Sequence, residues 1–385
     1  MLSARRSPTT LLSFCAAMLL SASALARVPD TATLEQVVTD FLAEHPDIPG
    51  IMVHLRSDAM GLEWSGAAGV ADRESGTPIR VDQPARLAST TKTYVSAAVL
   101  RLAERGLLNL DGSIDRYLSD EVDAILRSDG YATDAISVRH LLTHTGGIGD
   151  HLVDAFVEAI QTDRDREWTL SGTISFMTEV SDPLGPPGAV FLYSDGGYIL
   201  LGDIVQTASA TTLGPAVRDL LRFDALGLAA TWWEVMEPDP PHVAPRIGQY
   251  LFDSNIRDWK PTFDLYGGGG LVATMPDIAK FYEALFEGRV FTEPTTLATM
   301  LTSIVPERGG PFSGGLGLGG YQYCHGIFAS EHAGYTIFGH SGAWGTVGGY
   351  VPALDLAFGV SISMLDRNGR QNALLHRLID VLVAN

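Results

Sequence analysis

The chain has 385 residues, and its 45 acidic side chains outnumber the 26 Lys and Arg, which gives a formal net charge of −19. Nucleic acid backbones bind clustered positive charge, so this composition excludes DNA or RNA as the main partner. Two cysteines exclude a disulfide framework and a cysteine-rich zinc site. With 46% apolar and 18% charged residues, the chain has the composition of a globular protein with a large core.

Residues 1–26 have the pattern of a secretory signal peptide. Arg5 and Arg6 precede an apolar run at 11–20, and a small-x-small cleavage pattern ends at Ala26. The run is shorter than the ~20 residues that a membrane span needs. We therefore expect a periplasmic or secreted mature chain without a stable membrane anchor.

Hydrophobic periodicity predicts strands near both ends of the chain and mostly helices between them. The expected elements are a helix at 33–42, strands at 51–55 and 62–70, a helix opened by residues 89–92, helices at 198–207 and 277–287, strands at 335–338, 348–351 and 357–364, and a last helix at 371–383. This order predicts an α+β fold. Residues 27–88 and 300–385 would form its α/β part, and residues 89–299 a helical part inserted between them.

The sharpest local signal is Ser89 followed by Lys92 at the start of an amphipathic helix. Three residues are nearly one helical turn, so both side chains point to one face. A serine hydroxyl becomes a good nucleophile when a base takes its proton, and lysine does this where its pKa is lowered. The helix N-terminus adds N–H groups for a developing oxyanion. The alternative for these four residues is a capped helix beside a solvated lysine.

Further motifs accompany this one in a fixed order along the chain. The blocks are Arg86–Lys92, Gly106–Asp111, His140–Ile148, Pro187–Asp195 with Leu200–Gly202, Gly269–Thr274 and Gly339–Gly342. Together they resemble the serine β-lactamase and penicillin-binding D-Ala-D-Ala carboxypeptidase family, particularly its class C and family VIII esterase branches. The resemblance implies an antiparallel sheet flanked by helices with a mostly helical inserted subdomain. It also implies one catalytic domain over 27–385 that needs no cofactor.

The resemblance assigns the chemical steps to three side chains. Ser89 would be the acylated nucleophile, and Lys92 would be its proton acceptor or relay. Tyr193 matches the first position of the family's Tyr-x-Asn element. It would assist proton transfer to and from the leaving group. The implied reaction is a two-step acyl transfer in which water cleaves the acyl-enzyme.

The third family element corresponds to His340, Ser341 and Gly342. The resemblance places it on an edge strand that pairs with extended substrate, so Ser341 and Gly342 would bind substrate. The oxyanion hole would consist of the backbone N–H groups of Ser89 and Ala343. His340 stands where many members have Lys, which removes a permanent charge near a substrate carboxylate. We therefore expect a preference for esters or a pH dependence near neutrality.

Asp195 departs from the family pattern, because many members have Asn there and its amide donates to the substrate's carbonyl. An ionised Asp can only accept. One interpretation pairs Asp195 with Lys92, which holds the lysine charged and shifts proton abstraction toward Tyr193. A second favours a substrate that bears an amine. A third makes Asp195 the N-cap of the following helix.

Another reading of the third element is a nucleophile elbow, because Gly339–Ala343 resembles G-x-S-x-G. Asp366 and His376 follow in the chain order of an α/β-hydrolase. The elbow requires a strand, a turn and then a helix, whereas residues 344–351 predict a turn and a strand. The elbow is therefore the weaker prediction.

Two further patterns are excluded by their context. Residues 315–320 spell G-x-G-x-x-G, but a strand-like run follows instead of a helix, so no dinucleotide site is expected. His140 and His144 are four residues apart with His151 nearby, but no glutamate follows the first histidine as a zinc protease requires. These histidines are predicted to be structural, and no metal is expected.

The sequence thus predicts a secreted serine hydrolase that cleaves an amide, lactam or ester bond of a small-molecule or peptide substrate. A D-Ala-D-Ala carboxypeptidase-like or β-lactamase-like activity leads, and a carboxylesterase follows closely. A D-aminopeptidase, favoured by Asp195, is third, and a non-catalytic sensor of β-lactams or wall peptides is the alternative class. Pocket shape depends on loops 149–185 and 243–266, which carry no motif. No oligomeric state is predicted.

Overall fold

A computed structural model describes residues 31–189, 191–303 and 321–384. The predicted signal peptide at 1–26 and the glycine-rich run at 315–320 lie outside these ranges. Among the described helices, none combines the length and the apolar character needed to cross a membrane.

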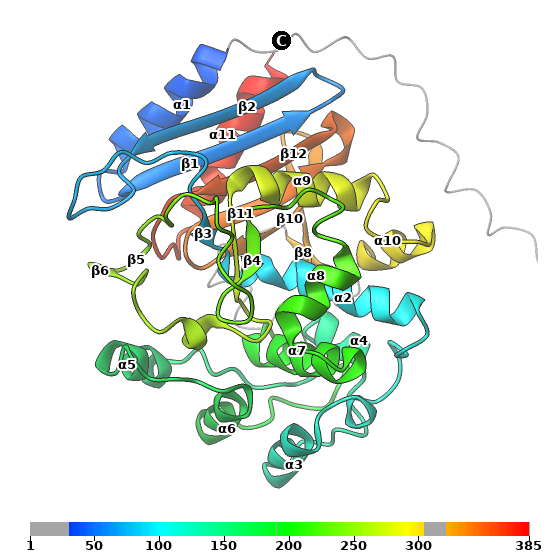
Figure 1. Ribbon diagram of the computed structural model, residues 1–385. Coiled ribbons are helices and arrows are strands. Elements are labelled where there is room, and N and C mark those ends of the chain that lie inside the picture. The colour runs from blue at the N-terminus through cyan, green and yellow to red at the C-terminus, as the bar shows by residue number, and fades with distance from the viewer. Residues whose placement is uncertain (1–30, 190, 304–320, 385) are drawn as a thin grey trace, which may run out of the picture.

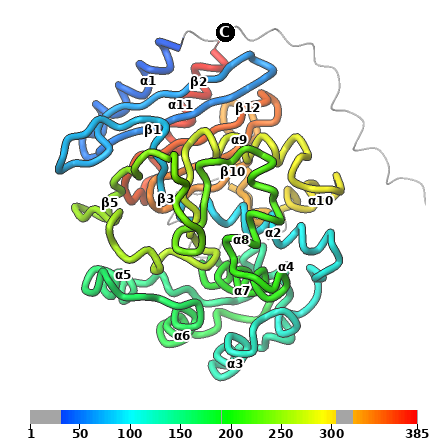
Figure 2. The backbone as a smooth tube through the Cα atoms, in the orientation of Figure 1, coloured from blue at the N-terminus to red at the C-terminus, as the bar shows by residue number. Residues whose placement is uncertain are grey.

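The fold is built on a seven-stranded antiparallel sheet with the order β2-β1-β12-β11-β10-β9-β8. Its strands are β1 Gly50–Ser57, β2 Leu62–Gly69, β8 Gln322–Tyr323, β9 Phe328–His332, β10 Tyr335–Gly342, β11 Thr346–Val351 and β12 Leu356–Ser361. Strand β1 pairs with β12, with Met52 opposite Ser361, so the two ends of the chain share one sheet. Figures 1 and 2 show these strands side by side. The α+β prediction is confirmed.

Helices cover both faces of this sheet (Figure 1). Helices α1 Thr31–Glu44 and α11 Arg370–Val383 pack on one face, and α9 Met275–Phe286 packs on the other. Two strand glycines let α9 approach closely. A Cβ at Gly348 would lie 2.3 Å from Ile278, and one at Gly359 would lie 2.5 Å from the Met275 carbonyl oxygen. Helix α9 thus packs on the sheet, although it falls within the segment expected to form the helical part.

The remaining helices form the other half of the molecule around α2, whose residues are nearly all buried. They are α2 Thr91–Glu104, α3 Asp120–Ser128, α4 Val138–Leu142, α5 Asp154–Thr162, α6 Leu170–Val180, α7 Asp195–Ser209, α8 Leu213–Leu221 and α10 Pro294–Met300. Short strands join the two halves: β3 Ala85–Arg86, β4 Thr231–Trp233 and β7 Leu271–Ala273 form one sheet, and β5 Tyr250–Leu251 and β6 Ser254–Asn255 form another. Strands of two or three residues carry no alternation that a sequence pattern can detect.

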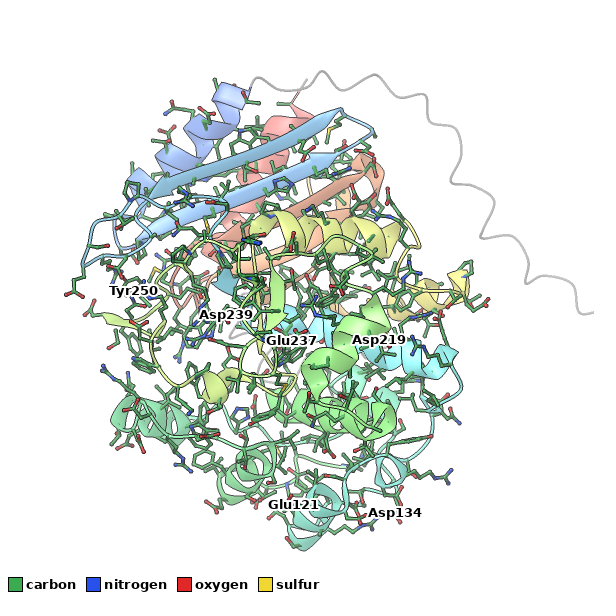
Figure 3. The ribbon with its side chains drawn as sticks, in the orientation of Figure 1. Glu121, Asp134, Asp219, Glu237, Asp239 and Tyr250 are labelled. Atoms are coloured by element: carbon green, nitrogen blue, oxygen red, sulfur yellow. The ribbon has the colours of Figure 1, made fainter. Side chains whose placement is uncertain are left out.

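Several acidic residues of the helical half lie at its surface. Glu121 of α3, Asp134 and Asp219 of α8 are exposed to solvent, and Figure 3 labels them. Solvated carboxylates need no buried partner, so these exposed residues add negative charge without destabilising the core.

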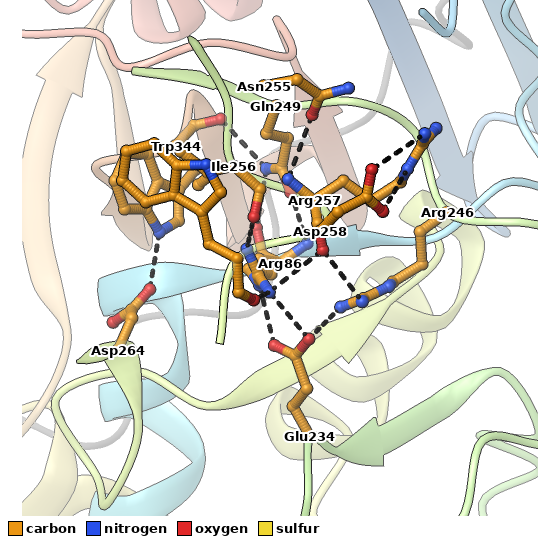
Figure 4. A network of polar contacts seen from close by, with 11 residues as sticks. Arg86, Glu234, Arg246, Gln249, Asn255, Ile256, Arg257, Asp258, Asp264 and Trp344 are labelled. Atoms are coloured by element: carbon orange, nitrogen blue, oxygen red, sulfur yellow. Dashed lines mark hydrogen bonds and ion pairs between the residues drawn. The ribbon is translucent and has the colours of Figure 1, made fainter. Parts of the chain in front are cut away.

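A buried ion-pair network holds the start of α2 in place (Figure 4). Arg86 of β3 donates to both carboxylate oxygens of Glu234, at 2.8 and 3.0 Å, and Arg246 pairs with the same carboxylate. Gln249 accepts from the Arg86 backbone N–H at 2.8 Å and donates to the Trp344 carbonyl at 3.2 Å. The network therefore ties β3, the loop before β5 and the turn after β10 into one unit.

Glu234→Ala should destabilise the protein strongly, because it leaves the guanidinium of Arg86, a residue only 4% exposed, without its carboxylate partner. Removing one partner of a buried pair costs about 3–5 kcal/mol. Urea unfolding followed by circular dichroism measures the change. The control is Asp258→Ala, which removes an exposed carboxylate beside Arg257 and should cost about 0–1 kcal/mol. Equal losses for the two variants would contradict this account.

Candidate active site

Ser89 lies in a 3-10 turn, Ala88–Thr90, that leads directly into α2. Ala88, just before it, has a φ of +45°, in the left-handed region that non-glycine residues rarely adopt. Such a backbone persists only where the surroundings hold it, and it is common at functional sites. The side chain of Ser89 is half-buried and lines a pocket of about 460 Å³.

The ends of β10 and β11 hold this serine turn. Thr90 Oγ1 donates to the His340 carbonyl at 3.1 Å, and Thr346 Oγ1 donates to the Leu87 carbonyl at 2.8 Å. A Cβ at Gly342 would lie 2.0 Å from that Leu87 oxygen. Glycine is therefore required at the end of β10, and the strand brings the residue after it, Ala343, to the same pocket as Ser89. These two residues are the ones expected to form the oxyanion hole.

Lys92 is completely buried and its ammonium group contacts three acceptors. Nζ donates to Ser89 Oγ at 2.9 Å and to the Gly268 carbonyl at 2.8 Å, and it forms an ion pair with Asp195. An ammonium has three N–H donors, so all of them are used. The expected pairing of Asp195 with Lys92 is therefore present in the structure.

Asp195 is the first residue of α7, and the N-cap is Ser194, whose hydroxyl accepts from the Gly197 N–H at 3.2 Å. The N-cap interpretation of Asp195 is therefore wrong, because the neighbouring serine fills that position. Tyr193 precedes the cap. Its ring centroid lies 5.1 Å from Lys92 Nζ. Burial raises the pKa of the Tyr193 phenol well above its ordinary value, and the nearby Asp195 carboxylate raises it further, while a hydrogen bond with Ser89 opposes the shift.

A buried histidine, His144, packs against the ring of Tyr193. The His144 ring lies 4.3 Å from the Tyr193 ring. His144 Nδ1 accepts from the Ser194 N–H at 3.1 Å, and its Nε2 lies 3.1 Å from the Tyr323 hydroxyl. His140 forms a capping box at the start of α4. Both histidines therefore have hydrogen-bond partners within the protein. The described residues contain no cluster of side chains suited to a metal ion.

His340 lies on β10 with its ring centroid 6.2 Å from that of Tyr193. Its Nδ1 lies 2.8 Å from the Ser341 carbonyl, and its buried Nε2 has no hydrogen-bond partner among the described residues. Burial and the Lys92 charge lower the pKa of His340 to about 3. The structure therefore contradicts the expected titration of His340 near neutrality, because desolvation disfavours the imidazolium. The imidazole is neutral at pH 7.

Strand β10 is not at the edge of the sheet, which corrects the expectation for the third element. It pairs with β11 on one side and with β9 on the other. The β9 pairing ends where Phe328 faces Gly339, so residues 340–342 extend beyond it. Within the third element, residues 340–342 therefore have no strand partner on the β9 side, and only there could an extended substrate pair with β10.

The side chain of Ser341 points to the other face of the sheet, where its Oγ lies within 3.2 Å of Asn372 on α11. Strand alternation puts Ser341 on the face opposite its neighbour His340, and both residues line the pocket. Because a turn and β11 follow β10, Ser341 does not lie on a nucleophile elbow. Asp366 forms an ion pair with Arg370, and His376 stacks on His332, so neither completes a triad.

The pocket above Ser89 has a volume of about 460 Å³ and a mainly apolar wall. Its lining includes Tyr193, His340, Gly342 and Ala343 besides Ser89. The apolar wall comes from α5, the β5 region and the turn after β10, and includes Phe156, Val157, Ile160, Leu251, Phe263, Leu265 and Trp344. Loops 149–185 and 243–266 therefore shape the pocket, as the sequence led us to expect.

The ionisable lining of the pocket is mainly acidic. Among the described lining residues, one arginine, Arg367, faces a larger set of aspartates, namely Asp150, Asp154, Asp195, Asp264 and Asp366. Trp344 Nε1 donates to Asp264 at 2.6 Å. Burial raises the pKa of Asp264 to about 6, and burial together with the nearby Asp195 raises that of Asp150 toward neutrality. The pocket therefore disfavours further negative charge.

Sequence reasoning missed three groups of this site. The Gly268 carbonyl, Asp150 and Asp264 belong to no motif that identifies an acceptor or an acid. A signal existed for the first, because the run of four glycines at 267–270 marks an unusual backbone. Gly267 and Gly270 have φ values of +121° and +123°. The two aspartates meet the site only through tertiary packing.

The chain is similar to several known proteins. It is 29% identical over 367 residues to esterase EstB of Burkholderia gladioli, which covers 87% of this chain and 89% of the esterase. Monacolin J acid methylbutanoyltransferase of Aspergillus terreus is 33% identical over 292 residues, 68% of each chain. D-amino acid amidase from Ochrobactrum anthropi SV3 shares the fold, with a TM-score of 0.76 and 22% identity over 91% of this chain and 98% of the amidase.

A family model described as beta-lactamase matches residues 34–382, almost the whole described chain. The match includes both halves of the fold and every segment that surrounds Ser89 and Lys92. The chain therefore belongs to the β-lactamase family and is a serine hydrolase of that family.

Proposed function

We propose that the protein is a carboxylester hydrolase that forms an acyl-enzyme on Ser89 and accepts uncharged esters with apolar acyl groups. The observation that carries the proposal is the placement of Ser89 Oγ, 2.9 Å from Lys92 Nζ, in a pocket with apolar walls and an acidic ionisable lining. The similarity to esterase EstB over most of both chains supports the same activity.

In the acylation step, Ser89 Oγ attacks the ester carbonyl. Because Lys92 already donates three hydrogen bonds, it acts as a fixed positive charge that stabilises the developing alkoxide. The Ser89 proton passes to the Tyr193 oxygen while the Tyr193 proton passes to the departing alkoxide, so the phenol stays neutral. Backbone N–H groups of Ser89 and Ala343 receive the oxyanion. Lys92 is thus a charge stabiliser, and Tyr193 is the relay.

Substrates with a carboxylate fit this pocket less well. Both β-lactams and D-Ala-D-Ala peptides carry one, and its recognition needs a cation near the third element. His340 is neutral there, and Lys92 is already paired with Asp195. The sequence alone favours a carboxypeptidase or β-lactamase activity. With this pocket, we rank the esterase activity above both.

The acidic lining supports a second candidate, an amidase for substrates with a free amine. Asp150, Asp195 and Asp264 lie around a single buried ammonium, so a second cation would be attracted to them. D-amino acid amidase shares the fold. Hydrolysis of a D-amino acid p-nitroanilide, but not of its N-acetylated form, would favour this candidate over the esterase.

We also propose that the protein is exported and loses residues 1–26. The basic start, the apolar run and the small-x-small pattern at Ala26 support this. N-terminal sequencing of protein recovered from the periplasm or medium tests it, and an intact Met1 would contradict it.

Ser89→Ala should abolish hydrolysis of p-nitrophenyl butyrate, and Tyr193→Phe should reduce kcat roughly 100- to 10,000-fold, the usual worth of a proton-transfer group. Nitrocefin and a D-Ala-D-Ala peptide run beside the ester decide the substrate class. Ser128→Ala, at an exposed serine of α3, is the control and should keep full activity. Faster turnover of nitrocefin or of the peptide than of the ester would reject the esterase.

Asp195→Asn should raise the turnover of nitrocefin, because the amide can donate to the substrate's acylamide carbonyl whereas the carboxylate cannot. One added hydrogen bond of roughly 1 kcal/mol corresponds to about a fivefold gain. Steady-state absorbance assays measure it. Asp154→Asn is the matched control, since it changes the pocket charge equally without contacting Lys92. An unchanged or lower nitrocefin turnover in Asp195→Asn would refute this prediction.

A further inference from the structure

A second histidine of the pocket has no role in the acylation step described above. His151 is 3% exposed and lies in the loop before α5. It lines the same pocket as Ser89 and Tyr193. Its ring packs edge-on against Phe156, with the centroids 4.7 Å apart and the planes at 89°. The ring is therefore fixed at the pocket wall.

One polar atom of this ring has no partner in the described part of the chain. His151 Nδ1 is buried there without a hydrogen bond, and it lies 3.6 Å from Asp150 Oδ1. A buried polar atom without a partner is costly, so such atoms usually have a function or a bound partner. Burial lowers the pKa of His151 to about 4, and the imidazole is neutral at pH 7. A neutral imidazole can accept a proton.

Asp150 is held so that its carboxylate stays beside this ring. The Leu152 backbone N–H donates to Asp150 Oδ1 at 3.1 Å, and the Asp195 backbone N–H donates to the same carboxylate. An ionised Asp150 favours the His151 tautomer with its proton on Nδ1, because that N–H then faces the negative charge. Nε2 is left as the acceptor. At 3.6 Å the carboxylate acts on the ring through its charge, without a hydrogen bond.

We propose that His151 is the general base for the second half of the reaction, in which water cleaves the acyl-enzyme. Asp150 is the residue that positions His151. The proposal rests on the proposed function, since it requires an acyl group on Ser89. It gives the attacking water a proton acceptor at the pocket wall besides the Tyr193 relay, because Lys92 has no free valence for a proton.

The step balances as follows. His151 Nε2 takes a proton from water while the water oxygen bonds to the acyl carbon, and the oxyanion forms. The bond between the acyl carbon and Ser89 Oγ then breaks, and Oγ takes the proton of Tyr193. The imidazolium proton returns to the Tyr193 oxygen through pocket water. The carboxylic acid leaves, and both side chains are neutral again.

Several charged groups set the pH dependence of this base. Lys92 of α2 and Asp195 of α7 act on His151 directly, and Asp150 adjoins it. Asp154 of α5 and Asp264 line the same pocket. Because the pKa of Asp150 is raised toward neutrality, its ionised form appears as the pH rises through the neutral range. Deacylation should therefore accelerate with pH in that range, and Asp150→Asn should remove the dependence.

The test is pre-steady-state hydrolysis of p-nitrophenyl butyrate by the full chain. His151→Ala should release a burst of about one p-nitrophenol per active site. A steady rate roughly 100- to 10,000-fold below the wild type should follow, with butyrylated Ser89 detected by intact-protein mass spectrometry. Added imidazole should restore part of the steady rate, which a purely structural role would not allow. His332→Gln, at a histidine of β9 outside the pocket, is the control and should behave as the wild type.

His151→Gln provides a second variant that keeps a polar side chain if the alanine variant does not fold. A slow steady rate without butyrylated Ser89, or an unchanged rate, would overturn the role of His151 while leaving the esterase intact. Failure of the proposed function looks different, because then the wild type would not form the acyl-enzyme and Ser89→Ala would keep its activity.

Discussion

The site depends on one buried ammonium group and the three acceptors around it. Lys92 Nζ contacts Ser89 in the turn before its own helix, the Gly268 carbonyl in a glycine loop, and Asp195 at the start of α7. Burying an ammonium is very unfavourable unless each donor is satisfied and the charge is balanced. This requirement links three segments that are distant in sequence, and it places the serine hydroxyl where a positive charge stabilises its alkoxide.

The rest of the fold serves to keep those segments in register. Both chain ends join in one sheet through β1 and β12, and the end of β10 then packs on the turn that carries Ser89. The absence of a side chain at Gly342 allows that contact. On the other side, the Arg86 network ties β3 to the loop that forms the pocket wall. The pocket is thus closed by elements that are each anchored by buried polar contacts.

The chemistry that this arrangement permits differs in emphasis from the family pattern. Lys92 is paired with Asp195 and His340 is neutral, so in the described lining a substrate carboxylate would meet only Arg367 as a cation, among several aspartates. Among the candidate substrates, a neutral ester then has the smallest desolvation cost when it enters an acidic, apolar cavity. In our proposal the Asp150–His151 pair supplies a base besides the Tyr193 relay, so different groups take the first proton in the two halves of the reaction.

Sequence alone determined the α+β class, most of the order of strands and helices, and several of the side chains that gather at the pocket, namely Ser89, Tyr193 and His340. These follow from hydrophobic periodicity and from motifs spaced along the chain, which are local properties. Ser89 and Lys92 are such a case, because one helical turn places them together. The family resemblance offered the pairing of Asp195 with Lys92 as one of three interpretations, and the structure contains that ion pair.

Only the tertiary structure decided the protonation state of His340, the interior position of β10, and the presence of Asp150, His151 and Asp264 at the pocket. Each depends on burial or on partners from remote segments. The pKa of an imidazole depends on its distance from water and from Lys92 Nζ, and the position of a strand depends on its neighbours on both sides. Neither the pKa nor the strand position follows from the neighbouring residues in the sequence, so only the packed structure determines them.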